Sequence, residues 1–278
     1  MPFFDPTDDP GPDFSALARR SGLLPVAPET AVDDRLPITH ATTVVAIRYA
    51  DGVVMAGDRR ATSGHLISHR AIEKVFPADR HSGVAIAGAA GPAMEMVKLF
   101  QLQLEHYEKV EGSQLSLEGK ANQLGQMVRG NLPAAMQGLA VVPIFAGYDT
   151  RRGAGRLFQY DVTGGRYEES NFATSGSGGS LAGSVIKMRF REAMARNEAV
   201  DLAITSLFEA ADEDSATGGP DMVRGIYPVI ATITADGFER VPEPEIADRF
   251  VALLESLSAR DGGGRLPETS TETAGGQS

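Results

Sequence analysis

Two apolar runs rich in β-branched residues, at residues 42–50 and 53–58, are separated only by the dipeptide Asp51-Gly52. That dipeptide is a strong hairpin signal, because a type I′ turn needs positive φ at both of its central positions. The chain is therefore predicted to begin its folded part with a β-hairpin. Two further strands are predicted at residues 66–76 and 83–90.

Helical periodicity follows these strands. Apolar residues then recur at steps of three and four, which is typical of a helix with one buried face. The first such helix carries Ala93, Val97, Phe100, Leu104 and Tyr107, and the second carries Leu117, Ala121, Leu124, Val128 and Ala135.

The second half of the chain repeats this order. Strands are predicted at residues 140–148, 156–162 and 166–173, helices at about 180–196 and 199–212, and a hairpin at 227–241 around Asp236-Gly237. A last helix carries Ile246, Phe250, Leu253 and Leu257. Such blocks of strands and helices indicate antiparallel sheets with segregated helices rather than alternating βαβ units. We predict an α+β fold of two stacked antiparallel sheets with helices on both outer faces.

The amino-acid composition excludes several classes of function. Of 278 residues, 42% are hydrophobic and 23% charged, so a sizeable core is expected. The net charge of −11 argues against a nucleic-acid partner, whose phosphates require a basic face. The absence of cysteine excludes disulfides, thiolate zinc sites and cysteine nucleophiles. No apolar run approaches the roughly 20 residues that span a bilayer, and the acidic start does not resemble a signal peptide. We expect a soluble, cytoplasmic protein that does not bind a membrane.

The two ends of the chain differ from the middle. Residues 1–41 are rich in proline and acids and have one partly apolar patch, residues 16–26, which predicts one small helix. Residues 261–278 are rich in glycine, serine and threonine, and we expect a disordered tail there.

Two charged residues stand in apolar surroundings. Asp58 ends the run V-V-M-A-G-D, and such a carboxylate is rarely buried without a partner. Lys74 lies in I-E-K-V-F, where strand alternation would place it on one face with Ile72 and Phe76. Lys74 either reaches along that face to solvent or is held inward as a fixed cation against Asp58.

Thr42 is an ordinary strand residue unless the chain is cut in front of it. After such a cut its hydroxyl and its new α-amino group would be a nucleophile and a base on one residue. The unperturbed pKa of an α-amino group, about 7.7–8.0, is close to what a base needs at neutral pH. A nearby lysine ammonium would lower that pKa by like-charge repulsion. We expect Thr43 to be only a strand residue.

The glycine-rich stretch at residues 175–180, S-G-S-G-G-S, lies between a strand and a helix. It matches none of the fingerprints G-x-G-x-x-G, G-x-S-x-G and the P-loop, so a nucleotide site is not expected. It is either a plain connection or a turn that brings backbone and a hydroxyl to a neighbouring site. The acidic run at residues 209–214 is typical of a solvated helix end.

Taken together, five stretches resemble the β subunit of the 20S proteasome of bacterial (actinobacterial) or archaeal type. They are T-T-V-V-A-I-R-Y-A-D-G-V-V-M-A-G-D-R-R-A-T, I-E-K-V-F, I-A-G-A-A-G, S-G-S-G-G and D-E-D-S-A-T-G-G, and the resemblance covers residues 36–258. It implies the four-layer αββα fold of N-terminal nucleophile hydrolases. It also implies three segments: a propeptide at 1–41, a catalytic domain at 42–260 and the tail.

The resemblance implies a threonine endopeptidase that needs neither a metal nor an organic cofactor. Thr42 would be the nucleophile after self-cleavage at the Ala41–Thr42 bond, with Asp58 and Lys74 as a charge pair beneath it. The N–H of Gly88 would form the oxyanion hole. The groups that support the amine would be Ser177, Asp214 and Thr217, and the specificity pocket would contain Ala61, Thr62, Ile72, Ile86, Ala90 and Met94.

Two positions depart from the family pattern. Ala41 stands where the family usually has glycine, and its methyl group restricts the backbone, so we expect slower self-cleavage. Thr217 stands where serine is frequent, and we expect no loss because both carry a hydroxyl.

The apolar pocket predicts cleavage after apolar residues. The implied partners are α subunits, other β subunits in heptameric rings, a ring ATPase acting through the α ring, and unfolded protein substrates. Alternatives are a β-type subunit that only builds the ring, the shorter HslV-type peptidase, and an N-terminal nucleophile amidase acting on a small molecule. The first is disfavoured because Thr42, Asp58 and Lys74 are all kept. The HslV-type peptidase is disfavoured because it is shorter, lacks a long propeptide and does not typically carry D-R-R, and the amidase because of the five-part match.

Overall fold

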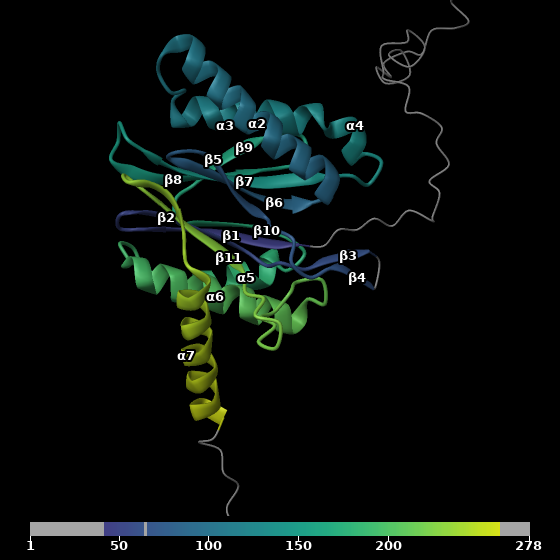
Figure 1. Cartoon of the computed structure of the whole chain (residues 1–278), viewed down its shortest axis with the longest axis vertical. Coiled ribbons are helices and arrows are strands. Elements are labelled where there is room, and N and C mark those ends of the chain that lie inside the picture. The colour runs from purple at the N-terminus through teal and green to yellow at the C-terminus, as the bar shows by residue number, and fades with distance from the viewer. Residues whose placement is uncertain (1–41, 64–65, 262–278) are drawn as a thin grey trace, which may run out of the picture. The chain divides into compact units, whose positions relative to one another are not determined.

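The computed structural model describes residues 42–63 and 66–261. Two five-stranded antiparallel sheets lie face to face with helices outside them (Figure 1). The first sheet has the order β10-β1-β2-β11-β12 and the second β5-β6-β7-β8-β9, while β3 and β4 pair only with each other. The predicted α+β fold of stacked antiparallel sheets flanked by helices is confirmed.

The elements of the first half are β1 (Thr43–Tyr49), β2 (Gly52–Gly57), β3 (Ala61–Ser63), β4 (Leu66–His69), β5 (Val75–Asp79), β6 (Ser82–Gly88), α2 (Ala90–Glu111), α3 (Leu117–Gly130) and α4 (Leu132–Ala135). Those of the second half are β7 (Val141–Asp149), β8 (Ala154–Tyr160), β9 (Arg166–Glu169), β10 (Phe172–Gly176), α5 (Gly179–Arg189), α6 (Arg196–Glu213), β11 (Val229–Thr234), β12 (Gly237–Arg240) and α7 (Glu243–Asp261).

Strand β1 shows why both hairpin strands are apolar throughout. Its side chains alternate between two cores: Val45 and Ile47 pack with α5 and α6, whereas Val44 and Ala46 face the second sheet. Neither face of a sheet that is covered on both sides contacts solvent, so apolar and polar residues do not alternate along its central strands. The second sheet is covered in the same way by α2 and α3, around Phe100 and its neighbours.

Two predicted strands are each divided in the structure. Residues 66–76 form β4 and β5, separated by an irregular connection at residues 70–74 that leads into the second sheet. Residues 166–173 form β9 in the second sheet and β10 in the first, with a bend at Ser170 and Asn171. Bends interrupt both runs, at Arg70 and Ala71 and at Ser170 and Asn171, and the side-chain pattern alone does not reveal that the chain changes sheets there.

The helices differ from prediction at their ends. α3 stops at Gly130, and Ala135 belongs to the separate short helix α4, which begins at Leu132 and has Pro133 in its first turn. Tyr107 was predicted on the buried face of α2, but its side chain is exposed. The helix predicted at residues 16–26 lies outside the described residues, as does the tail beyond residue 261.

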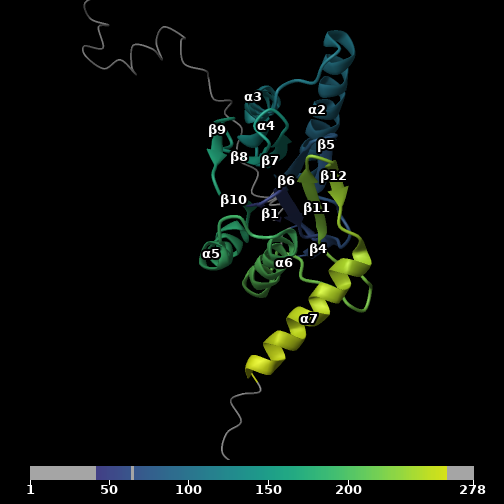
Figure 2. The same cartoon turned by 90° about the vertical axis from the view of Figure 1, so that its left-hand side faces the viewer.

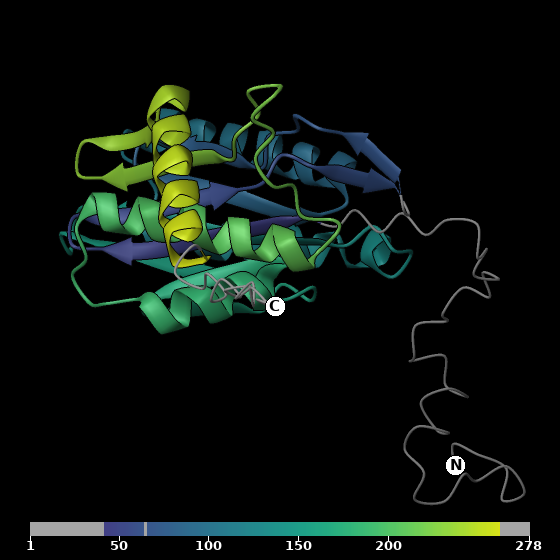
Figure 3. The same ribbon diagram turned by 90° about the horizontal axis from the view of Figure 1, so that it is seen from below.

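α7 is anchored at its start. Ile246 and Phe250 are buried in the core between the first sheet and α6, while the later turns extend away from the layers (Figures 1 and 2). Seen from below, the β3–β4 hairpin projects beyond the sheets (Figure 3). In the described part of the chain, no helix is long and apolar enough to cross a membrane.

Candidate active site

A carboxylate buried at the end of β2 lies at the centre of the site. The side chain of Asp58 is 0% exposed. Its Oδ1 accepts hydrogen bonds from the Thr43 N–H at 2.9 Å and from Lys74 Nζ at 2.6 Å. Its Oδ2 accepts from the N–H groups of Arg60 at 2.9 Å and Gly218 at 2.8 Å. Four donors therefore replace the water that this charge loses on burial.

Lys74 is the cation of this pair. Its side chain is 3% exposed, and Nζ also donates to the Arg60 carbonyl at 2.6 Å. Burial lowers the pKa of Lys74, and the attraction of Asp58 offsets part of that shift. Of the two orientations left open by the sequence, the structure has the inward one. Removing one member of such a buried pair typically costs about 3–5 kcal/mol, because the other charge is left uncompensated.

A second carboxylate, Asp214, ends a chain of hydroxyls. Asp214 Oδ2 accepts hydrogen bonds from Ser177 Oγ at 2.5 Å and Thr217 Oγ1 at 2.6 Å. Thr217 Oγ1 also lies 2.6 Å from Thr43 Oγ1. Since the single proton of Thr217 goes to Asp214, the Thr43 hydroxyl must donate to Thr217. The structure thus adds Thr43, which occupies β1 and also belongs to this network.

Burial by itself would raise the pKa of Asp214. The hydrogen bonds from Ser177, Thr217 and the Ala216 N–H outweigh that effect and hold the pKa of the carboxyl below its ordinary value. Asp214 is therefore ionised at neutral pH and keeps the hydroxyl chain oriented toward itself.

The glycine-rich stretch at residues 175–180 brings backbone close to both networks. The Ser177 N–H donates to the Thr42 carbonyl at 2.9 Å, and the Gly178 N–H donates to Thr43 Oγ1 at 2.9 Å. A Cβ at Gly178 would lie 2.6 Å from the hydroxyl oxygens of both Thr43 and Thr217. Glycine is required there by close approach, which is the second of the two interpretations left open by the sequence.

Thr42 lines a pocket whose other residues come from β3, the 70–74 connection, the end of β6 and the start of α2. Five of the six residues predicted for the specificity pocket line it: Ala61, Ile72, Ile86, Ala90 and Met94. Lys74, Gly88, Glu73, Ala87 and Ala93 complete the lining. Thr62 does not line this pocket; it is a buried residue of β3.

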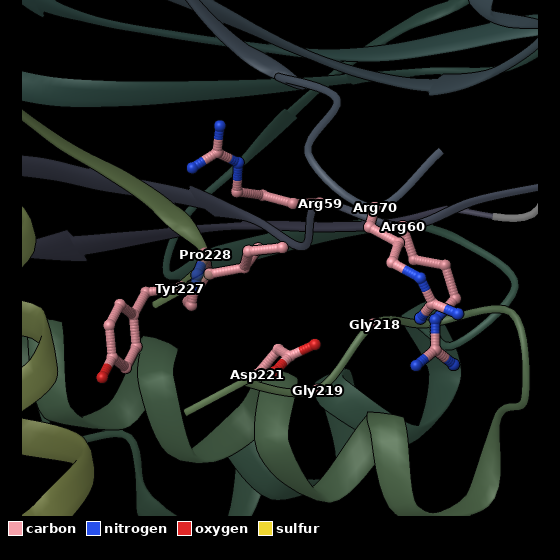
Figure 4. Close-up of a pocket in the computed structure, with 9 residues that line it drawn as sticks. Arg59, Arg60, Arg70, Gly218, Gly219, Asp221, Tyr227 and Pro228 are labelled. Carbon is pink, nitrogen blue, oxygen red and sulfur yellow. The ribbon is translucent and has the colours of Figure 1, made fainter. Parts of the chain in front are cut away.

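A separate pocket adjoins the Asp58 network (Figure 4). Arg60 and Gly218, whose N–H groups bind Asp58, both line it. The guanidinium of Arg60 donates to the carbonyls of Ser215 and Thr217 at 2.9 and 3.1 Å. Arg60 thereby ties the 214–218 loop, which carries Asp214 and Thr217, to the end of β2.

The described residues contain no group of three histidine, cysteine, aspartate or glutamate side chains that could hold a metal ion. The site combines a threonine that lines a pocket with three charged groups. These are the fixed ammonium of Lys74, the buried carboxylate of Asp58 and the hydroxyl-bound carboxylate of Asp214. Such a set suits proton transfer to and from a hydroxyl nucleophile.

Comparison with known proteins identifies the family to which this chain is similar. Residues 38–224 match the family described as "Proteasome subunit". A "Proteasome subunit beta" from Acidimicrobium ferrooxidans is 55% identical over 262 residues, covering 94% of this chain and 95% of the relative. A "Proteasome subunit beta" from Streptomyces griseus is 56% identical over 216 residues, covering 78% and 77%.

The lowered pKa of Asp214 predicts a pH-dependent contribution to stability. A carboxyl whose pKa is lower in the folded state stabilises the fold above its unfolded pKa of about 3.9, and that contribution is lost as pH falls through the folded value. We expect Asp214→Asn to lower the melting temperature by about 2–6 °C at pH 7, and the deficit to shrink below about pH 4. Thermal unfolding across pH tests this. Asp236→Asn, in an exposed turn, is the control, and a deficit for Asp214→Asn that is constant with pH would contradict it.

Proposed function

The chain belongs to the proteasome subunit family as a β subunit of bacterial (actinobacterial) type, a threonine-type endopeptidase of the 20S core that assembles with α and β subunits, and from this premise we propose that Thr42 is its nucleophile. One observation carries the proposal. Thr42 and Lys74 line the same pocket, and Lys74 is held there by the buried carboxylate of Asp58.

The first reaction in this proposal is self-cleavage. Thr42 Oγ attacks the carbonyl carbon of Ala41, and the peptide bond is exchanged for an ester while the nitrogen of Thr42 becomes a free amine. Water then hydrolyses the ester and releases residues 1–41 as a propeptide. The remaining chain is the catalytic domain, with Thr42 as its first residue, and residues 261–278 are a tail outside it.

The second reaction is cleavage of a substrate. The Thr42 amine, directly or through a water molecule, takes the Oγ proton as Oγ attacks the substrate carbonyl. Lys74 favours the neutral amine by charge repulsion, and the N–H of Gly88 stabilises the oxyanion. The amine gives its proton to the leaving nitrogen, and water resolves the acyl-enzyme. Ser177, Asp214 and Thr217 hold the amine in place.

The substrates in this proposal are unfolded proteins cut after apolar residues. The apolar wall of the pocket is built of Ala61, Ile72, Ile86, Ala90 and Met94. The two charged residues of the lining, Glu73 and Lys74, are already paired with Arg240 and Asp58, so a P1 side chain gains free energy there mainly by burying apolar surface. The partners we propose beyond the α and β subunits are a ring ATPase that feeds the substrate through the α ring, and β subunits arranged in heptamers.

Self-cleavage is tested by the intact mass of the chain after co-assembly with its α subunit. We predict loss of residues 1–41, and retention of the full length in Thr42→Ala, because the variant lacks the attacking oxygen. Thr205→Ala, a helix hydroxyl far along the chain that donates to the Asp201 carbonyl, is the control and should be processed. Full-length wild-type chains in assembled particles would contradict the proposal.

The pocket preference is tested with fluorogenic peptides that differ only at P1. We predict the highest kcat/KM for leucine, phenylalanine or tyrosine, about tenfold or more above glutamate or arginine. A charged P1 side chain would lose its water on binding, and the charged groups of the lining, Glu73 and Lys74, already pair with Arg240 and Asp58. Met94→Glu should lower the apolar rates selectively. Faster cleavage after acidic or basic residues in the wild type would refute the apolar preference.

A further inference from the structure

Lys74 lies outside both sheets, at the end of the irregular connection at residues 70–74. β4 ends at His69 and β5 begins at Val75. The main chain of the connection is held where the Ile72 N–H donates to the Arg59 carbonyl at 3.1 Å and the Ile86 N–H donates to the Lys74 carbonyl at 2.9 Å. A connection without a ladder needs other contacts to fix a side chain that must meet Asp58.

Side chains supply those contacts. Arg240 binds both carboxylate oxygens of Glu73, Nη1 to Oε1 at 2.9 Å and Nη2 to Oε2 at 2.7 Å. Arg59 donates from Nη2 to the Ala71 carbonyl at 3.2 Å and from Nη1 to Glu243 at 3.3 Å. In Figure 4 the Arg59 guanidinium points away from those of Arg60 and Arg70, as these partners require.

Both contacts lead to one place in the fold, the junction of β12 and α7. Arg240 is the last residue of β12, and Glu243 is the first residue of α7. This junction is itself fixed, because Val241 is buried and its N–H donates to the Ile230 carbonyl at 2.9 Å. The first sheet therefore holds the connection that carries Lys74.

We propose that the Glu73–Arg240 ion pair is a positioning device for Lys74, an inference that rests on the proposed function. Glu73 is turned toward Arg240 and its neighbour Lys74 is turned toward Asp58, so the pair sets the rotation of the backbone between them. Glu73 and Arg240 are 38% and 46% exposed, and pairs this exposed contribute little to stability. Their geometry matters more, since misplacing a catalytic group by about 1 Å can cost about 100-fold in rate.

The direction in which the acid limb of kcat shifts distinguishes a positioning role of Glu73 and Arg240 from a purely electrostatic one. The acid limb of kcat against pH reports protonation of the Thr42 amine in the proposed mechanism. The charged groups around Lys74 are Asp58 at the end of β2, Arg60 beyond it and Asp214 after α6. If Lys74 moves away from the amine, the acid limb moves to higher pH. If Glu73 and Arg240 act only as charges, losing Glu73 moves it to lower pH and losing Arg240 to higher pH.

The test uses processed particles assembled from the full chain and its α subunit. We expect Glu73→Gln and Arg240→Met each to lower kcat about tenfold, and both to move the acid limb of kcat to higher pH. Glu73→Asp, which keeps the charge but shortens the side chain, should do the same. The swap Glu73→Arg with Arg240→Glu should regain at least half of the lost activity. Glu239→Gln, the same charge change at an exposed position of β12, should match the wild type.

Shifts of the acid limb in opposite directions for Glu73→Gln and Arg240→Met would overturn the inference. So would a wild-type pH profile for Glu73→Asp, or a double swap that is no more active than the single variants. Lys74→Met distinguishes this failure from failure of the proposed function. An inactive Lys74→Met with unaffected Glu73 and Arg240 variants would leave the proposed function standing without the positioning pair. An active Lys74→Met would instead remove the role that the proposed function gives to Lys74.

Discussion

The buried carboxylate of Asp58 is the interaction on which the rest of the site depends. A charge with no exposed surface persists only when every lone pair finds a donor. The four donors come from β1, from the turn after β2, from the 70–74 connection and from the 214–218 loop. Satisfying one anion therefore fixes four parts of the chain that are distant in sequence, and these parts carry or adjoin the proposed nucleophile Thr42, the cation Lys74 and the second carboxylate Asp214.

The four-layer fold makes this convergence possible. The hairpin of β1 and β2 is buried on both faces. Because β1 and β2 pair antiparallel with Val44 opposite Gly57, Thr42 and Asp58 lie at the same end of the hairpin. The second sheet contributes β6, which ends at Gly88 beside the pocket, and α2, which adds Ala90 and Met94. The pocket thus lies where the end of β6, the start of α2 and the 70–74 connection meet Thr42, and its apolar wall continues the core.

Much of this could be predicted from the sequence, because hairpin dipeptides and helical periodicity are local signals. The inward orientation of Lys74 could not, since an apolar strand pattern fits a snorkelling lysine equally well. The division of residues 66–76 could not be predicted either, because no glycine or proline marks the bend at Arg70 and Ala71. Thr43 is a strand residue, as its pattern predicts, but its part in the hydroxyl network is not predictable from that pattern, because its partner Thr217 lies 174 positions away. Thr62 was assigned to the pocket by resemblance alone, and strand β3 keeps it outside the lining.

The central claim is that the ammonium of Lys74, fixed by Asp58, makes the α-amino group of mature Thr42 a base at neutral pH. The direct measurement is the pKa of that amine in assembled particles, from ¹⁵N chemical shifts of threonine-labelled protein across pH. The account predicts a value below the unperturbed range of about 7.7–8.0 in the wild type, and a rise in Lys74→Met. The same pKa in both proteins, or a wild-type value above that range, would contradict it.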